Sequence, residues 1–222
     1  MPKVSPKFST EKAHATQLQL SKRVIRKNML PENIRYVAGV DIAYTKGISI
    51  GAAVVLDFTS LSPIESRVSS VKTLFPYIPT LLSFREVPPA LSVIRKLRVQ
   101  PDVLLVDAHG IMHPYRLGFA AHLGLVMDRP TIGVAKSPLC GESEPLRGTR
   151  WAPIIDKGEI VGAEVVTKPG KKPVYVSVGH KVSLETAIDI VLNCTQAHRI
   201  PEPTRKAHAI ASNERRKLTH RL

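Results

Sequence analysis

The sequence predicts a single α/β domain, residues 1–222, in which helices flank a mixed central β-sheet. Three observations support this class. The chain has 222 residues, of which 43% are hydrophobic, enough to bury one substantial core. Three strand-like segments joined by short turns come first, a pattern typical of an antiparallel meander. Short apolar segments then alternate with helical patterns, which is typical of strands that helices cover on both faces.

The first half of the chain is expected to hold one helix and the meander. Leu18, Val24 and Ile25 fall roughly on one helical face, which predicts a helix over about residues 11–27. The strands of the meander are expected at 36–44, 48–58 and 65–73.

The second half is expected to alternate between helices and strands. Pro88 and Pro89 interrupt the pattern, and Pro89 suits the first position of a helix that runs to Leu97. Ser183 suits the N-cap of a helix through Cys194. Further strands are expected at 103–107, 131–135, 151–155, 160–167 and 173–178, a loop at 138–150, and helices at 115–125 and about 205–217. The termini, 1–10 and 218–222, are expected to be flexible.

The charge of the chain indicates a polyanionic partner. Lys plus Arg is 32 and Asp plus Glu is 18, a formal net charge of +14, which favours nucleic acid or an anionic membrane surface. Ordinary surface lysines or a ribosome-associated protein are the plainer alternatives. Aromatic residues are only 5% of the chain, which disfavours a platform of exposed rings for single strands. Two distant cysteines, no secretory signal and no membrane-spanning apolar stretch predict a cytoplasmic protein.

Three carboxylates are candidates for a metal site. Asp41 lies within an apolar strand, Asp107 ends another, and Glu86 lies between them in the sequence. Burial of an ionised carboxylate is costly unless a partner offsets it. Two such charges about 4 Å apart repel by about 4 kcal/mol at an effective dielectric of 20, and a hard divalent cation removes that penalty. Acids on neighbouring strands of a basic protein therefore suit metal-assisted phosphodiester hydrolysis.

Each of these acids also has a structural interpretation. Asp41 could cap the turn that follows its strand, and Asp107 could N-cap the next segment. Glu86 could pair with a nearby arginine, Arg85 or Arg95.

Histidines form a second candidate group. His109 and His113 have the i, i+4 spacing of helical zinc ligands, but Gly110 and Pro114 disfavour a continuous helix there. A histidine close to a phosphate or to a metal-bound water is the better functional interpretation, and a solvated loop histidine is the alternative.

A rigid tetrapeptide, Pro76-Tyr77-Ile78-Pro79, forms the third candidate. Stiff apolar wedges of this kind enter the base stack of a duplex and kink it. The alternative is a proline-bounded loop with Tyr77 in the core.

Taken together, these residues resemble the endonuclease V family, the deoxyinosine 3′-endonucleases. The resemblance extends from about Leu18 to about Arg216. Its motifs are VAGVD at 37–41, PYIP at 76–79, FRE at 84–86, residues 103–110, HP at 113–114, RLG at 116–118, HLG at 122–124, GVAKS at 133–137, and PEPTR at 201–205 with His208.

The resemblance implies a ribonuclease H-like fold and a DNA repair activity. The implied reaction is cleavage, dependent on Mg²⁺ with Mn²⁺ as a substitute, at the second phosphodiester bond 3′ to deoxyinosine, leaving 3′-hydroxyl and 5′-phosphate ends. The implied metal site is Asp41, Asp107 and Glu86, with His208 and Lys136 as further catalytic residues. The implied wedge is Pro76, Tyr77, Ile78 and Pro79, and the implied base pocket contains Leu82, Gly110 and His113.

The chain departs from the family pattern at four positions. Thr80 and Ser83 stand where the family often has Gly and Ala, Ala108 replaces a frequent Gly, and Tyr115 replaces a frequent Arg. Thr80 and Ala108 border the implied base pocket and bear on base selectivity.

The partners implied are double- and single-stranded DNA that contains deoxyinosine, with inosine-containing RNA as a further substrate, no membrane, and a monomeric protein. One alternative keeps the nuclease chemistry but acts mainly on inosine-containing RNA or on branched or mismatched DNA. A non-catalytic nucleic-acid-binding module is another alternative, although it gains nothing from three acids that face phosphate. A membrane-surface or ribosomal protein fits acids within strands poorly.

Overall fold

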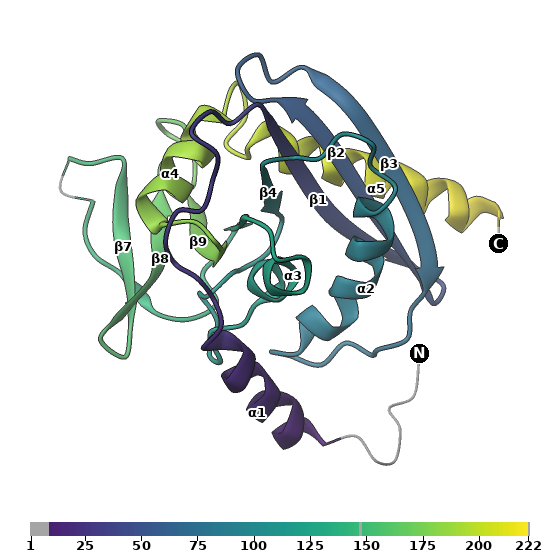
Figure 1. Ribbon diagram of the computed structural model, residues 1–222, viewed down its shortest axis with the longest axis horizontal. Helices are drawn as coiled ribbons and strands as arrows, with labels where there is room; N and C mark the ends of the chain where they lie inside the picture. Colours follow the sequence, from purple (N-terminus) through teal and green to yellow (C-terminus); the bar gives the residue numbers. More distant parts are fainter. Residues whose placement is uncertain (1–8, 147, 222) are drawn as a thin grey trace.

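A nine-stranded mixed sheet forms the centre of the computed structural model, which describes residues 9–146 and 148–221 (Figure 1). Its strands are β1 (Tyr36–Thr45), β2 (Ile48–Asp57), β3 (Pro63–Lys72), β4 (Val103–Val106), β5 (Thr131–Ala135), β6 (Glu142–Ser143), β7 (Trp151–Asp156), β8 (Glu159–Val165) and β9 (Val174–His180). The helices of the described residues are α1 (Thr10–Ser21), α2 (Leu82–Ile94), α3 (Phe119–Met127), α4 (Leu184–Asn193) and α5 (Glu202–Arg221).

The strand order is β3-β2-β1-β4-β5-β9-β8-β7-β6. Strands β1, β4 and β5 are parallel, and the other pairs are antiparallel. The α/β class with a mixed sheet and the antiparallel meander β1–β2–β3 are therefore confirmed. Parallel neighbours end at the same edge of a sheet, so the segments after β4 and β5 meet beside β1.

Helices cover both faces of the sheet. Helices α2 and α3 pack on one face around Ala38, Val40 and Leu104, and α4 and α5 pack on the other around Val37 and Leu105. Figure 1 shows α5, in yellow, crossing the meander strands. None of the described helices carries the long apolar stretch that crossing a bilayer requires.

Helix α2 begins seven residues before the start predicted from the sequence, at Leu82 rather than Pro89, and it contains Pro88 and Pro89. Each proline removes one backbone donor, yet the helix continues because one side of it is buried. The buried side chains of this side follow the helical spacing: Ser83, Glu86, Val87, Ala90, Val93 and Ile94. The helical spacing of buried residues therefore continues through Pro88 and Pro89, and it places Glu86 on the buried side of α2.

Two other helices differ from the predicted bounds. Helix α3 is displaced toward the C-terminus of its predicted range and begins at Phe119 after the N-cap Gly118. Helix α5 is longer at both ends than predicted and includes residues 218–221, where Thr45 and Thr219 share a hydroxyl hydrogen bond of 2.8 Å. The predicted N-cap at Ser183 is confirmed, since its hydroxyl accepts a hydrogen bond from Thr186 N. The predicted loop at 138–150 contains the short strand β6.

Helix α1 ends at Ser21, six residues before the predicted end, and its predicted apolar face is wrong. Leu18 and Ile25 are 47% and 36% exposed, whereas Gln17 is fully buried. The Gln17 amide nitrogen donates to the backbone oxygens of Thr80 at 2.8 Å and Leu117 at 3.2 Å. Two buried hydrogen bonds of Gln17, together with the packing of Leu20 against the core, therefore attach this helix. Of the predicted flexible N-terminus, residues 1–8 lie outside the described residues, and so does residue 222 at the other end.

We expect Gln17→Ala to lower the free energy of unfolding by about 2 kcal/mol, because it removes two buried hydrogen bonds to backbone oxygens. Chemical denaturation measures this change. The matched control is Gln19→Ala on the exposed side of the same helix, for which we expect a change near zero. Equal effects of the two variants would contradict the role of Gln17 in attaching α1.

Candidate functional site

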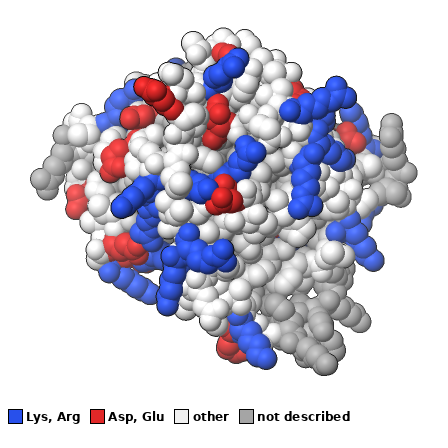
Figure 2. All heavy atoms as spheres, viewed as in Figure 1, with Lys and Arg blue, Asp and Glu red and all other residues white. Residues whose placement is uncertain are grey.

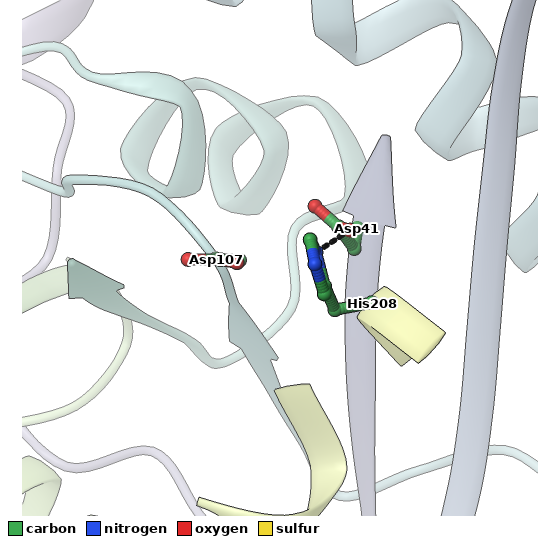
Figure 3. A group of neighbouring side chains, drawn as sticks. All are labelled: Asp41, Asp107 and His208. Carbon is green, nitrogen blue, oxygen red and sulfur yellow. Dashed lines mark hydrogen bonds and ion pairs between the residues drawn. The ribbon is translucent and has the colours of Figure 1, made fainter. Parts of the chain in front are cut away.

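The pairing of two parallel strands brings the first two carboxylates together. Val40 of β1 pairs with Val106 of β4, so Asp41 and Asp107, the next residues of each strand, lie level with one another. Ligand atoms of Asp41, Asp107 and His208 all lie within 4.8 Å of one another. Figure 3 shows the three side chains converging from β1, the segment after β4, and α5.

Helix α5 contributes His208 because it lies unusually close to β1. A Cβ on Gly39 would lie 1.9 Å from the backbone oxygen of Pro203, so only glycine permits this approach. His208 follows on the same helix, and its Nδ1 lies 2.9 Å from Oδ2 of Asp41. The glycine of the VAGVD motif thus sets the position of a histidine 169 residues later in the chain.

The two carboxylates differ in their surroundings. Burial raises the pKa of Asp41, and the nearby Asp107 raises it further, while His208 opposes both effects. Asp107 accepts a hydrogen bond of 2.7 Å from Nζ of Lys136, which follows β5 and is about half exposed. A basic side chain at the open edge therefore partly neutralises the site.

Glu86 lies beside this group on the buried side of α2. Burial, followed by repulsion from Asp41, raises the pKa of Glu86 to about 8. Tyr44 Oη donates a hydrogen bond of 3.3 Å to its carboxylate. Glu86 is not one of the three residues whose ligand atoms lie within 4.8 Å of one another. Glu86 lines the open concavity that contains Asp41, Asp107 and His208, and it also lines a neighbouring cavity.

These contacts do not support the structural interpretations of Asp41 and Asp107, whereas the charge of Arg85 does act on Glu86 and opposes the rise in its pKa, without an ion pair within hydrogen-bond distance. Asp41 hydrogen-bonds to His208 rather than to the turn after β1. The N-cap of the next helix, α3, is Gly118 rather than Asp107. The hydrogen bond of Glu86 is with Tyr44. Two carboxylates and one imidazole, held together in a basic protein, suit a divalent cation, because such an ion removes the repulsion between the acids.

We call Asp41, Asp107 and His208, with Glu86 and Lys136 beside them, the acidic group; a cavity of about 300 Å³ opens next to it and shares three of these residues. Glu86, Asp107 and Lys136 lie at the boundary of the two. The rest of the wall consists of Tyr77, Thr80, Leu82, Ser83, Ala108, His109, His113, Gly118, Phe119, Ala135, Ser137 and Leu139.

Two of the three predicted base-pocket residues line this cavity. Leu82 and His113 are on its wall, whereas Gly110 lies behind it. A Cβ on Gly110 would lie 2.0 Å from the backbone oxygen of Val178, so this glycine permits close packing on β9. Gly118, rather than Gly110, lines the wall of the cavity, and its amide donates a hydrogen bond to the Gly110 backbone oxygen at 2.9 Å.

The tetrapeptide 76–79 contributes Tyr77 to the wall of the cavity. Tyr77 is 65% exposed, which excludes the alternative that places it in the core. Pro76 and Ile78 are half-buried and Pro79 is exposed. An exposed aromatic ring between two prolines, beside a cavity, has the form of a wedge.

The N-terminal helix holds the loop that follows the wedge, which the sequence did not predict. Thr80 has a φ of 68°, a left-handed conformation that is costly for a residue other than glycine. His14 Nε2 lies 2.8 Å from the Thr80 hydroxyl oxygen, and Gln17 binds the Thr80 backbone oxygen. The His14 ring stacks on Tyr115 with centroids 4.0 Å apart. Thr80 and Tyr115 are two of the four positions where the chain departs from the family pattern.

The histidines of the segment after β4 are held neutral. Burial lowers the pKa of His113 and of His122 to about 4, and it also lowers the pKa of His109. The His113 Nδ1 accepts a hydrogen bond of 3.1 Å from the Tyr115 amide. Among residues 9–146 and 148–221, neither His109 nor His113 belongs to a group of side chains close enough to share a metal ion.

Positive charge is distributed over the face of the molecule drawn in Figure 2. Figure 2 shows Lys and Arg in several separate clusters on one face, with Asp and Glu between them. This face therefore carries no single basic patch that could account for the net charge of +14.

Comparisons with known proteins agree with this site. Residues 18–209 match the family model described as Endonuclease V. Endonuclease V from Nostoc sp. is 48% identical over 210 residues, 93% of this chain and 95% of that protein. The crystal structure of Endonuclease V from Streptomyces avermitilis is 38% identical, with a TM-score of 0.89 and coverage of 95% of both chains. Endonuclease V from Ciona intestinalis, solved with DNA that contains an inosine followed by a ribo-adenosine, is 32% identical with a TM-score of 0.86, over 94% of this chain and 98% of that one.

A more distant likeness concerns the fold alone. The crystal structure of A. aeolicus Argonaute matches with a TM-score of 0.51 at 12% identity, over 84% of this chain and 29% of that one. The mixed sheet with helices on both faces is thus the predicted ribonuclease H-like fold. The match to the family model over most of the chain, together with relatives of nearly half identical sequence, shows that this chain belongs to the Endonuclease V family.

Proposed function

We propose that this endonuclease recognises deoxyinosine in DNA and cleaves the second phosphodiester bond 3′ to it, leaving 3′-hydroxyl and 5′-phosphate ends. The observation that carries the proposal is the convergence of Asp41, Asp107 and His208 beside a cavity with an exposed aromatic rim. A relative of the same family has been solved with inosine-containing DNA. The role is DNA repair, because deoxyinosine is the product of the deamination of deoxyadenosine in DNA.

Asp41, Asp107 and His208 would hold a divalent ion, Mg²⁺ with Mn²⁺ as a substitute, and Glu86 would complete the site from behind. When bound, such an ion supplies Lewis acidity at the phosphate and lowers the pKa of a bound water. His208 keeps the Asp41 carboxylate oriented. Lys136, in its ion pair with Asp107, is placed to neutralise charge on a phosphate at the same edge.

The wedge and the cavity divide the recognition of the base between them. Tyr77 would enter the base stack, and an extruded base would enter the adjacent cavity between Leu82 and the neutral His113. A mispaired inosine costs less to extrude than a paired base, which itself supplies selectivity. Thr80 and Ala108 line the same wall and bear on which base is accepted.

Inosine-containing RNA is a second candidate substrate. The DNA bound to the Ciona intestinalis relative has a ribo-adenosine after the inosine, so that protein accommodates a ribonucleotide at this position.

We further propose a monomer that acts in the cytoplasm. Both cysteines, Cys140 and Cys194, are free, which suits a reducing compartment.

Asp107→Ala should reduce metal-dependent nicking of an inosine duplex by at least about 1000-fold, because it removes a metal ligand. Binding of the same duplex should be retained, because loss of the Asp107 carboxylate removes a negative charge that would repel the DNA phosphate. Nicking and binding assays on paired oligonucleotides, inosine against guanine, measure both effects. Asp189→Ala, an exposed acid on α4, is the control. Retained metal-dependent cleavage would remove Asp107 from the mechanism.

Tyr77→Ala should weaken binding of an inosine duplex by about tenfold, the expected loss for one base-stacking ring. The melting temperature should change little, because the ring is exposed. The control is Leu74→Ala, a side chain 75% exposed at the start of the same loop. Equal affinities of the two variants and the wild type would exclude the wedge.

Glu86→Gln should raise the melting temperature of the metal-free protein at pH 8 and have a much smaller effect at pH 5. The pKa of Glu86 is raised to about 8 in the fold, so the wild type loses stability as pH rises from the ordinary carboxyl range through 8. A glutamine carries no charge and avoids that loss. Thermal melts in chelator at the two pH values measure the difference. A variant less stable than the wild type at pH 8 would contradict the raised pKa.

A further inference from the structure

A second cavity, of about 450 Å³, lies outside the site described above. It is enclosed by the loop after β8, the loop after α4 and the first turn of α5. Its wall consists of Lys168, Pro169, Lys171, Ala197, His198, Arg199, Ile200 and Arg205. Five of these eight residues are Lys, Arg or His and none is acidic, so we call it the basic cavity.

Hydrogen bonds between the two loops hold the basic cavity open. The Arg199 guanidinium donates to the backbone oxygen of Pro173 at 2.7 Å and to that of Lys172 at 3.3 Å. The hydroxyl of the buried Thr167 donates to the Arg199 backbone oxygen at 2.7 Å. Arg199 is therefore joined to the segment before β9 by its side chain and by its backbone, which gives the cavity a defined wall.

Most of the charge in the basic cavity is uncompensated. Arg205 forms two hydrogen bonds with the buried carboxylate of Glu202, at 2.9 and 2.6 Å, which fix its orientation. In the described part of the chain, no acidic side chain forms an ion pair with Lys168, Lys171 or Arg199. Three unpaired cations around one concavity attract an anion that carries several acceptor oxygens, and a phosphate has that chemistry.

The basic cavity lies at the same edge of the sheet as the acidic group. Arg205 and His208 are three residues apart on α5, so they share one side of the helix, at a rise of about 4.5 Å. Tyr175, at the start of β9, pairs with Ala135, which directly precedes Lys136. One strand of nucleic acid can therefore reach from the acidic group to the basic cavity along this edge.

We propose that the basic cavity binds a backbone phosphate of the same nucleic-acid strand, a few nucleotides from the bond that is cleaved. The proposal rests on the proposed function for the identity of the strand. A free phosphate or a mononucleotide has the same chemistry but no reason to be placed beside a site that acts on a phosphodiester. The basic cavity would thus fix the register of the strand while the wedge and the first cavity identify the base.

The experiment uses the double variant Lys168→Gln, Lys171→Gln and the matched double variant Lys96→Gln, Arg98→Gln. Both variants remove two positive charges. Lys96 and Arg98 are exposed in the segment between α2 and the N-terminal end of β4, whereas the acidic group lies at the C-terminal end of β4. Affinity for an inosine duplex is measured in chelator over a series of salt concentrations. We expect the basic-cavity variant to bind about fivefold more weakly and to show a salt slope smaller by about 1, the change for one lost phosphate contact. The matched variant should resemble the wild type.

A scan of the backbone locates the contact. Single methylphosphonates, which remove the phosphate charge, are placed at successive positions of the duplex. We expect one position outside the cleaved bond to weaken wild-type binding and to have no further effect on the basic-cavity variant. Loss at the same positions in both proteins, or equal salt slopes of the two double variants, would overturn the proposal.

Two further arms separate the possible failures. Competition by inorganic phosphate that the basic-cavity variant abolishes, without any position-specific effect in the scan, would assign the cavity to a free anion and overturn the proposal. If the wild type does not distinguish inosine from guanine, the proposed substrate fails, while the scan on the guanine duplex still tests the phosphate contact by itself.

Discussion

The parallel pairing of β1 with β4 is the constraint on which the rest of the site depends. The register that pairs Val40 with Val106 places the carboxylates of Asp41 and Asp107 side by side, where they repel one another. This arrangement is unfavourable for stability and suits cation binding, so the chain retains a local cost that only the function explains. The surrounding residues reduce the cost without removing it, through His208 on one side and Lys136 on the other.

Three layers of the fold meet at this point, and each supplies what the others cannot. The strands hold the two aspartates in fixed positions. Helix α5 provides the imidazole of His208, because Gly39 allows this helix to approach β1 closely, and α2 provides the buried carboxyl of Glu86. The first cavity and the wedge lie on the α2 side of the acids, whereas the basic cavity lies on the α5 side. In the proposed function, the site that recognises the base and the site that contacts the backbone are thus separated in space but share one sheet edge.

The N-terminal helix is attached to the first cavity by the side chains of His14 and Gln17. Both residues precede the segment that matches the family model, residues 18–209, and both side chains bind Thr80 on the wall of the first cavity. A glycine at that position would adopt the left-handed conformation without support. With threonine at this position, contacts from His14 and Gln17 of α1 maintain the conformation. The residue that differs from the frequent glycine is therefore held by two side chains that lie outside the motif.

The sequence by itself determined the class of fold, the meander, the two acids within strands and the family, because apolar periodicity and short motifs are local properties. The helix across Pro88 and Pro89 was missed because the buried side of α2, rather than local propensity, keeps it intact. The burial of Gln17 was missed because its partners lie 63 and 100 residues away. Only the tertiary structure decided that His208 meets Asp41, that Gly110 lies behind the cavity wall, and that five basic residues from three segments line one cavity, because these contacts join residues distant in sequence.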